Sequence, residues 1–94
     1  MDTQTILQNG KGSIVDVRTT QEFMGGHVAG SKNIPLMEIP QRMDELKALP
    51  QPLVLCCASG NRSGQATHFL KAQGFECYNG GSWVDVNFLT TTTV

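Results

Sequence analysis

Two short apolar runs, at 13–17 and 53–56, most constrain the fold of this chain. Both are rich in branched aliphatic residues, and both are too short to form a buried helix, so each predicts a strand that is covered on both faces. Segments with helical spacing lie between and around the two runs. Buried strands that alternate with short helices predict an α/β domain built on a mainly parallel sheet.

Capping and turn signals predict the other elements. Thr19 and Glu22 have the spacing of a capping box, so we expect a helix there that carries Phe23 inward. We expect the tail at 90–94 to fray. In chain order, the predicted elements are a short helix at 5–9, the strand at 13–17, the capping-box helix up to Gly25-Gly26, an edge strand at 33–35, a helix between Pro40 and Pro50, the strand at 53–56, a helix from about Arg62 to Gly74, and a strand at 75–78 that ends before Gly80-Gly81.

Size and charge exclude several classes of protein. The 94 residues allow one domain, 1–94, and the share of apolar residues (39%) and of charged residues (16%) suits a compact core. A net charge of -1 gives no electrostatic case for nucleic acid or a membrane as partner. No apolar run has membrane-spanning length, and the first residues lack the features of a signal peptide. We expect a cytoplasmic protein and a monomer.

The three cysteines do not form a disulfide framework or a metal site. Cys56 and Cys57 are adjacent, and a bridge between neighbours strains the peptide bond that joins them. The chain has no CxxC pair, and His27 and His68 stand alone, so we expect no bound metal. Cys77 lies in an apolar run and is predicted to be a core residue.

The segment from Cys57 to Ser63 carries the clearest chemical signal. Cys57 follows the second buried run, so it falls at the carboxyl end of a parallel strand, where α/β domains place their sites. A thiol with a pKa of about 8.5 reacts as thiolate, and the N-terminus of the helix that follows favours the charged form. The backbone N–H groups across the loop can form an anion-binding nest.

Each loop residue has a role in this interpretation. Ala58, Ser59 and Gly60 are small enough for close approach of the backbone, and Gly60 permits positive φ. The hydroxyl groups of Ser59 and Ser63 are hydrogen-bond donors. The remaining members of the predicted anion site are Asn61, through its backbone, and Arg62, whose guanidinium offers a fork for oxyanions. The alternative is a buried structural cysteine followed by a polar turn.

Two cysteines compete for the nucleophile position. Counted from Cys57, Arg62 closes a six-residue Cys-x4-Arg loop. Counted from Cys56, the same arginine closes Cys-x5-Arg followed by Ser63, which is the pattern of cysteine phosphatases. Strand alternation points the two side chains to opposite faces of the sheet. The tighter loop suits a sulfur atom carried on the cysteine, and the wider loop suits tetrahedral phosphate.

Between about residues 13 and 83 the chain resembles the single-domain rhodaneses, a family of sulfurtransferases. The motifs that carry this resemblance are, in order, Ile14-Val15-Asp16-Val17-Arg18, Glu22-Phe23, Gly26-His27-Val28-Ala29-Gly30, Asn33-Ile34-Pro35-Leu36, the loop from Cys57 to Ser63, Gly74-Phe75 and Gly80-Gly81. Trp83 follows Gly80-Gly81 sooner than the family pattern places its tryptophan, and the family often has a further strand before the first helix. Neither departure touches the loop.

The resemblance implies a small parallel sheet with helices on both faces and a sulfur transfer in two steps. Cys57 would take sulfane sulfur from a small anionic donor such as thiosulfate, with Arg62 on the donor, and a thiol or a protein acceptor would remove it. No cofactor is implied. Two other functions remain: a cysteine phosphatase or arsenate reductase that uses Cys56 and Arg62, and a module that carries persulfide or binds a partner without turnover.

Other polar residues near the motifs have structural interpretations. Asp16 and Arg18 at the end of the first strand are predicted to form a structural ion pair or to anchor a loop. His27 is predicted to be a hydrogen-bonded turn residue, and His68 to be exposed on the helix after the loop. We expect Trp83 to contribute packing.

Overall fold

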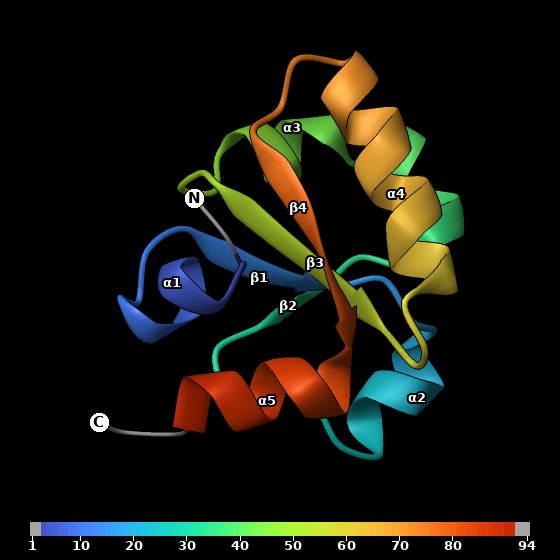
Figure 1. The fold of residues 1–94 in the computed structure, drawn as a ribbon. Helices are drawn as coiled ribbons and strands as arrows, with labels where there is room; N and C mark the ends of the chain where they lie inside the picture. Colours follow the sequence, from blue (N-terminus) through green and yellow to red (C-terminus); the bar gives the residue numbers. More distant parts are fainter. Residues whose placement is uncertain (1–2, 92–94) are drawn as a thin grey trace.

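A parallel sheet forms the centre of the molecule. The computed structural model describes residues 3–91, and in this part the sheet has four strands in the order β2-β1-β3-β4 (Figure 1). All neighbouring pairs are parallel, as the alternation of strands and helices predicted. The strands are β1 (Ser13–Asp16), β2 (Lys32–Asn33), β3 (Leu53–Cys57) and β4 (Cys77–Ser82).

Helices cover both faces of the sheet, which confirms the predicted fold class. On one face lie the 3-10 helix η1 (Leu36–Gln41), α3 (Met43–Lys47) and α4 (Asn61–Ala72). On the other face lie α1 (Thr3–Gln8) and α5 (Trp83–Thr91). The short helix α2 (Thr20–Met24) sits near the carboxyl end of β3 (Figure 1).

Strand β3 divides the core into two parts. Its five residues are all buried, and alternate side chains enter different apolar clusters. Leu55 and Cys57 pack with the α4 side, whereas Val54 and Cys56 pack with the α1 and α5 side. The period of two along a strand is the reason for this division. The two adjacent cysteines therefore face opposite sides of the sheet, as predicted.

Helix α2 begins where the sequence predicted but does not bury its aromatic residue. Thr19 and Glu22 form a complete capping box. The expectation that Phe23 points into the core is wrong, because α2 lies on the surface and has no buried residue. The Phe23 ring instead stacks on the His27 ring, with 3.8 Å between centroids and 11° between planes.

The C-terminal part differs most from the sequence prediction. Strand β4 does not end before Gly80-Gly81 but continues to Ser82, and its register against β3 shifts between Leu55 and Cys56. Gly80 marks a close approach: a Cβ there would lie 2.8 Å from Val54 Cγ1 and 2.9 Å from Val86 Cγ2. Helix α5 was not predicted. Packing of Val86, which is buried, outweighs the low helix propensity of its β-branched residues.

Smaller differences concern the segment boundaries. Thr90 and Thr91 belong to α5 and were wrongly predicted to fray, while 92–94 lie outside the described residues. The helix predicted between Pro40 and Pro50 is present as α3, and the 3-10 helix η1 before it, which contains Pro40, was not predicted. The edge strand covers Lys32–Asn33 rather than 33–35. Within residues 3–91, none of the helices is long and apolar enough to cross a bilayer.

Candidate active site

The cysteine loop lies at the carboxyl end of β3, as predicted. Cys57 is the last residue of the strand and is only 1% exposed. Gly60 has a φ of 100°, in the left-handed region, and this turn leads directly into α4 at Asn61. Gly60 thus adopts the positive φ that the sequence analysis said it permits. The turn brings the first N–H groups of α4 beneath the strand end, close to the sulfur.

Two backbone N–H donors and one hydroxyl group surround the Cys57 sulfur. The Gly60 N–H donates to Sγ at 3.0 Å and the Ser63 N–H at 3.4 Å. The Ser63 Oγ also lies 3.4 Å from Sγ. Burial by itself would raise the pKa of Cys57, but these hydrogen bonds outweigh it and hold that pKa below the ordinary value of a thiol. Thiolate is the form that these groups stabilise.

The other two cysteines have the opposite electrostatics. Burial raises the pKa of Cys56 to about 12, and the nearby Asp16 carboxylate adds to the effect. Burial also raises the pKa of Cys77, and all three thiols are free. Cys57 alone among the three is poised to react as thiolate. This difference in pKa counts against a phosphatase loop built on Cys56. So does the position of the Cys56 side chain, which lies on the opposite face of the sheet from that of Cys57.

Arg62 is engaged by a carboxylate that the sequence analysis did not connect to the site. Its Nη1 and Nη2 donate to the two Glu22 oxygens at 2.7 and 3.0 Å. The ion pair, led by the hydrogen bonds of Arg62, lowers the pKa of Glu22 to about 2. Glu22 is also the N3 residue of the α2 capping box, where it accepts from the Thr19 N–H at 3.0 Å. One carboxylate therefore links α2 to the cysteine loop.

Asn79 on β4 is a second residue that the sequence analysis missed. Its Nδ2 donates to the Gly60 carbonyl at 3.0 Å, and its Oδ1 accepts from the Ser63 hydroxyl at 2.7 Å. Oδ1 also accepts from the Gly81 N–H at 3.0 Å. The side chain thus holds both ends of the turn that presents donors to Cys57. The chain carries no local signal for this contact, since an asparagine before two glycines reads only as a turn.

The Ser63 hydroxyl has one proton and two acceptors within reach. In the structure it donates to Asn79 Oδ1, and by rotation about its C–O bond it can instead donate to the Cys57 Sγ. The other predicted loop residues, Ala58, Ser59 and Asn61, are exposed around the turn. The Ser59 N–H also helps to lower the pKa of Cys57.

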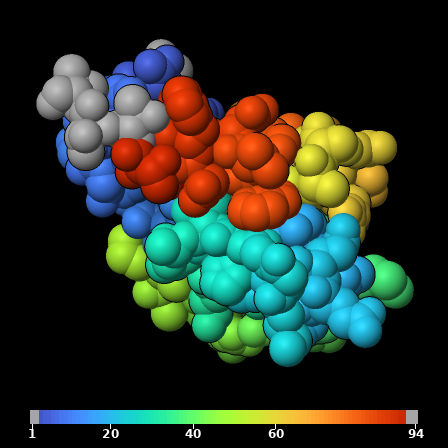
Figure 2. Space-filling view, turned by 90° about the horizontal axis from the view of Figure 1, so that it is seen from below, coloured from blue at the N-terminus to red at the C-terminus, as the bar shows by residue number. Residues whose placement is uncertain are grey.

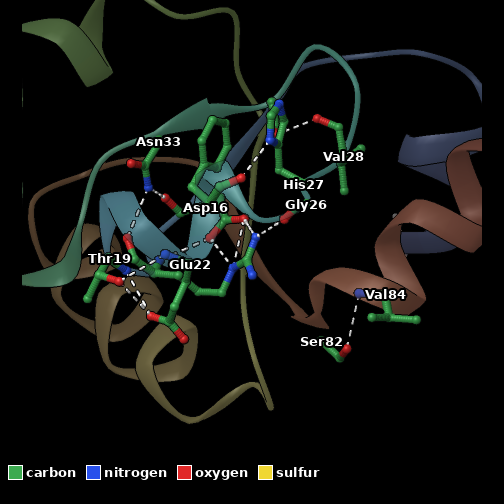
Figure 3. A network of polar contacts seen from close by, with 12 residues as sticks. Asp16, Thr19, Glu22, Gly26, His27, Val28, Asn33, Ser82 and Val84 are labelled. Carbon is green, nitrogen blue, oxygen red and sulfur yellow. Dashed lines mark hydrogen bonds and ion pairs between the residues drawn. The ribbon is translucent and has the colours of Figure 1, made fainter.

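A buried ion pair connects the end of β1 to the turn that follows α2. Arg18 forms hydrogen bonds from Nε and Nη2 to the Asp16 carboxylate at 2.8 to 3.1 Å, and Nη2 also donates to the Gly26 carbonyl at 2.7 Å (Figure 3). Its guanidinium lies 4.7 Å from the centroid of the Trp83 ring. These contacts confirm the structural interpretation of Asp16 and Arg18 and the packing role of Trp83.

The two histidines also have the structural settings that the sequence predicted. His27 Nδ1 lies 2.7 Å from the Phe23 carbonyl oxygen, across the turn that follows α2. His68 is exposed on α4. Among residues 3–91, no three His, Cys, Asp or Glu side chains gather closely enough to hold a metal ion.

Two other segments lie near the loop on the molecular surface. Figure 2 shows α5 and the segment that follows α2 side by side, with the loop after β3 next to them. Arg62 also lines a groove of about 660 Å³. It is lined by Val17, Thr19, Thr20, Gln21, Pro35, Leu36, Met37, Glu38 and Arg62.

The fold and the site together define an α/β domain with a cysteine of lowered pKa, cradled by backbone N–H groups at the end of a parallel strand. The chain belongs to the rhodanese family: the model of the rhodanese-like domain matches residues 2–85. YqhL of Bacillus subtilis, an uncharacterized protein, is 41% identical over 70 residues, which cover 73% of this chain and 55% of YqhL. The chain thus spans about half the length of that relative.

Two further proteins connect the chain to named sulfurtransferases. The thiosulfate sulfurtransferase PspE of Escherichia coli is 33% identical over 76 residues, which cover 77% of this chain and 71% of PspE. A solved structure of a rhodanese with anions from E. coli superposes with a TM-score of 0.71 and 31% identity, and covers 78% of this chain and 88% of that one.

Proposed function

We propose that this domain is a thiosulfate-type sulfurtransferase that carries sulfur on Cys57. The observation that carries the proposal is the cradle around Sγ, in which the Gly60 N–H, the Ser63 N–H and the Ser63 hydroxyl lie within 3.0 to 3.4 Å. Such a cradle stabilises negative charge on a cysteine sulfur and on a sulfur atom attached to it. The relationship to PspE supports the choice of sulfur chemistry.

The proposed reaction has two steps, each a displacement at sulfur. The Cys57 thiolate attacks the sulfane sulfur of thiosulfate; a new S–S bond forms, the old S–S bond breaks, and sulfite leaves with the electron pair. Cys57 then holds a persulfide, whose terminal sulfur bears the negative charge. A thiophilic acceptor such as cyanide or a thiolate attacks that outer sulfur, and Cys57 leaves as thiolate. No external oxidant or reductant is needed.

Residues of this chain stabilise charge in both steps. In the resting state the Gly60 and Ser63 N–H groups hold the thiolate. In the persulfide state the other N–H groups of the loop, from Ala58 to Arg62, are proposed to hold the outer sulfur. Arg62 is proposed to meet the anionic end of the donor, by the same fork that now holds Glu22.

A carrier that delivers the persulfide to a partner protein would share the first step and differ only in the acceptor. The phosphatase alternative would need thiolate on Cys56, whose pKa of about 12 and whose direction away from the loop count against it.

The test is intact-protein mass spectrometry after incubation with thiosulfate. We expect the wild type and Cys56→Ser to gain one sulfur atom and Cys57→Ser to gain none. Loading of sulfur on Cys57→Ser would overturn the assignment of the carrier residue. Absence of loading on the wild type would overturn the proposed function. If loading occurs but transfer to cyanide is slow, a protein acceptor becomes the preferred second substrate.

A further inference from the structure

The Arg62–Glu22 ion pair bears on which sulfur donors the site accepts. Both terminal nitrogens of the guanidinium are hydrogen-bonded to Glu22, one to each carboxylate oxygen. This is the bidentate geometry with which arginine also binds sulfonate and phosphate groups. The carboxylate therefore occupies the positions that the oxygens of a small anionic donor would take.

The charge of Glu22 persists at all pH values near neutrality. Its pKa of about 2, lowered chiefly by the hydrogen bonds from Arg62, keeps it ionised, so Arg62 and Glu22 together contribute no net charge beside the loop. The adjoining groove offers no replacement: among the described residues that line it, Arg62 is the single cation, and the one carboxylate, Glu38, is already paired with Arg42. A free anion that approaches Cys57 must compete with Glu22 for the guanidinium.

We propose that Glu22 is a specificity-determining residue, an internal anion that occupies the fork of Arg62 and disfavours small free anions at Cys57 relative to uncharged reagents. The inference deepens the proposed function, because it concerns the donor side of the same site. It follows that small oxyanions such as thiosulfate are poorer donors for this chain than the cysteine cradle alone would allow. Glu22 acts by occupying Arg62, not by touching the reacting sulfur.

Glu22→Gln isolates the charge from the fold. A capping box accepts glutamine as well as glutamate at this position, so the amide oxygen can still accept from the Thr19 N–H. The same amide oxygen can still accept one hydrogen bond from Arg62, but a bond to a neutral acceptor is weaker than the present pair of bonds to a carboxylate. The variant thus retains α2 and removes the competing anion.

Glu45→Gln is the matched control. Glu45 on α3 also pairs with an arginine through two hydrogen bonds, from Arg42 at 2.6 and 2.8 Å. Its side chain is 41% exposed, against 37% for Glu22. The control makes the same change in net charge and breaks the same kind of pair, but the arginine that it releases, Arg42, lies outside the cysteine loop. Any long-range effect of charge appears in both variants.

The first measurement compares alkylation of Cys57 by iodoacetate and by iodoacetamide. In both reactions the thiolate displaces iodide and forms an S–C bond, and only the charge of the reagent differs, so the ratio of the two rates cancels any change in thiolate fraction. Peptide mass spectrometry assigns the product to Cys57. We expect Glu22→Gln to raise the iodoacetate-to-iodoacetamide ratio about two- to fivefold, the range for a partly exposed ion pair, and Glu45→Gln to leave it unchanged.

The same substitution in an Arg62→Ala variant tests whether the change in the alkylation ratio depends on Arg62. In Arg62→Ala the fork is absent, so adding Glu22→Gln should raise the ratio much less than it does in the wild type. An equal rise in both backgrounds would mean that Glu22 repels anions directly, and would overturn the proposed competition. A fall in the ratio in Glu22→Gln would mean that Glu22 positions Arg62 for anions, which is the opposite of the proposal.

The second measurement is the KM for thiosulfate, determined from the rate of persulfide formation. It should fall in Glu22→Gln by a factor similar to the rise in the alkylation ratio. Because alkylation requires no sulfur transfer, the two ideas fail separately. A higher ratio in a protein that loads no sulfur would leave the inference about anions in place and overturn the proposed function. Normal sulfur loading with an unchanged alkylation ratio and an unchanged KM would leave the proposed function in place and overturn the inference about anions.

Discussion

Replacing Asp16 with alanine should destabilise the fold strongly, because it leaves the Arg18 guanidinium buried without its carboxylate. Asp16 is 0% and Arg18 5% exposed. The carboxylate accepts from the backbone N–H of Arg18 as well as from Nε and Nη2. After the substitution Arg18 keeps only the Gly26 carbonyl and the face of Trp83 among these partners.

The magnitude follows from the asymmetry of buried ion pairs. Removing one partner of such a pair costs about 3–5 kcal/mol, since the other charge is left unpaired in a poorly solvated place. Gly26 and Trp83 retain part of the stabilisation of Arg18, so we expect the free energy of unfolding to fall by about 3 kcal/mol. For a domain of this size that corresponds to a fall in Tm of roughly 12–24 °C.

The assay is urea unfolding followed by the fluorescence of Trp83, with thermal melting as a second probe. Arg18→Met and the double variant complete a mutant cycle, and the double variant should lose much less than the sum of the two single losses. Should Asp16→Ala not fold, Arg18→Met and the double variant still report whether the pair is coupled. A loss below about 1 kcal/mol for Asp16→Ala, or additive losses in the cycle, would refute the reasoning.

Three further predictions concern the loop and the turns. Ser63→Ala removes a hydrogen bond to the sulfur and so raises the pKa of Cys57; iodoacetamide alkylation should slow near pH 7 and match the wild type at high pH, and an unshifted profile would contradict this. Asn79→Ala should shift the same profile in the same direction, because it releases the turn that presents the donors; unchanged alkylation would leave Asn79 without a positioning role. Gly12→Ala places a Cβ against the backbone oxygen of Pro52 at a φ of +73°; it should destabilise the fold more than Gly10→Ala, which meets nothing within 4 Å and costs about 1–2 kcal/mol for its positive φ alone, and equal melting temperatures would contradict this.

The cysteine loop could be predicted from the sequence because its signals are local. An apolar run predicts β3, a small-residue turn with Gly60 predicts the left-handed conformation, and the period of two predicts that Cys56 and Cys57 face opposite sides. The capping box of α2 is equally local, since its two partners lie three residues apart. In each case the residues that determine the local structure lie within a few positions of one another in the sequence.

Helix α5 and the end of β4 could not be predicted in this way. The sequence 83–91 has few good helix formers, and only the space between β4 and α1 makes burial of Val86 favourable. Gly80 reads as a strand breaker until Val54 and Val86 are seen on either side of the place where its side chain would be.

By itself, the sequence predicted the parallel α/β sheet, the position of Cys57 at the end of β3 and the turn at Gly60 that leads into α4. Only the tertiary structure decided what the loop contacts: Glu22 on Arg62, 40 residues away, and Asn79 on Ser63, 16 residues away. The physical reason is range. Propensity, alternation and capping act over a few neighbouring residues, whereas the partner of a charged or polar side chain depends on which elements the packed core brings together.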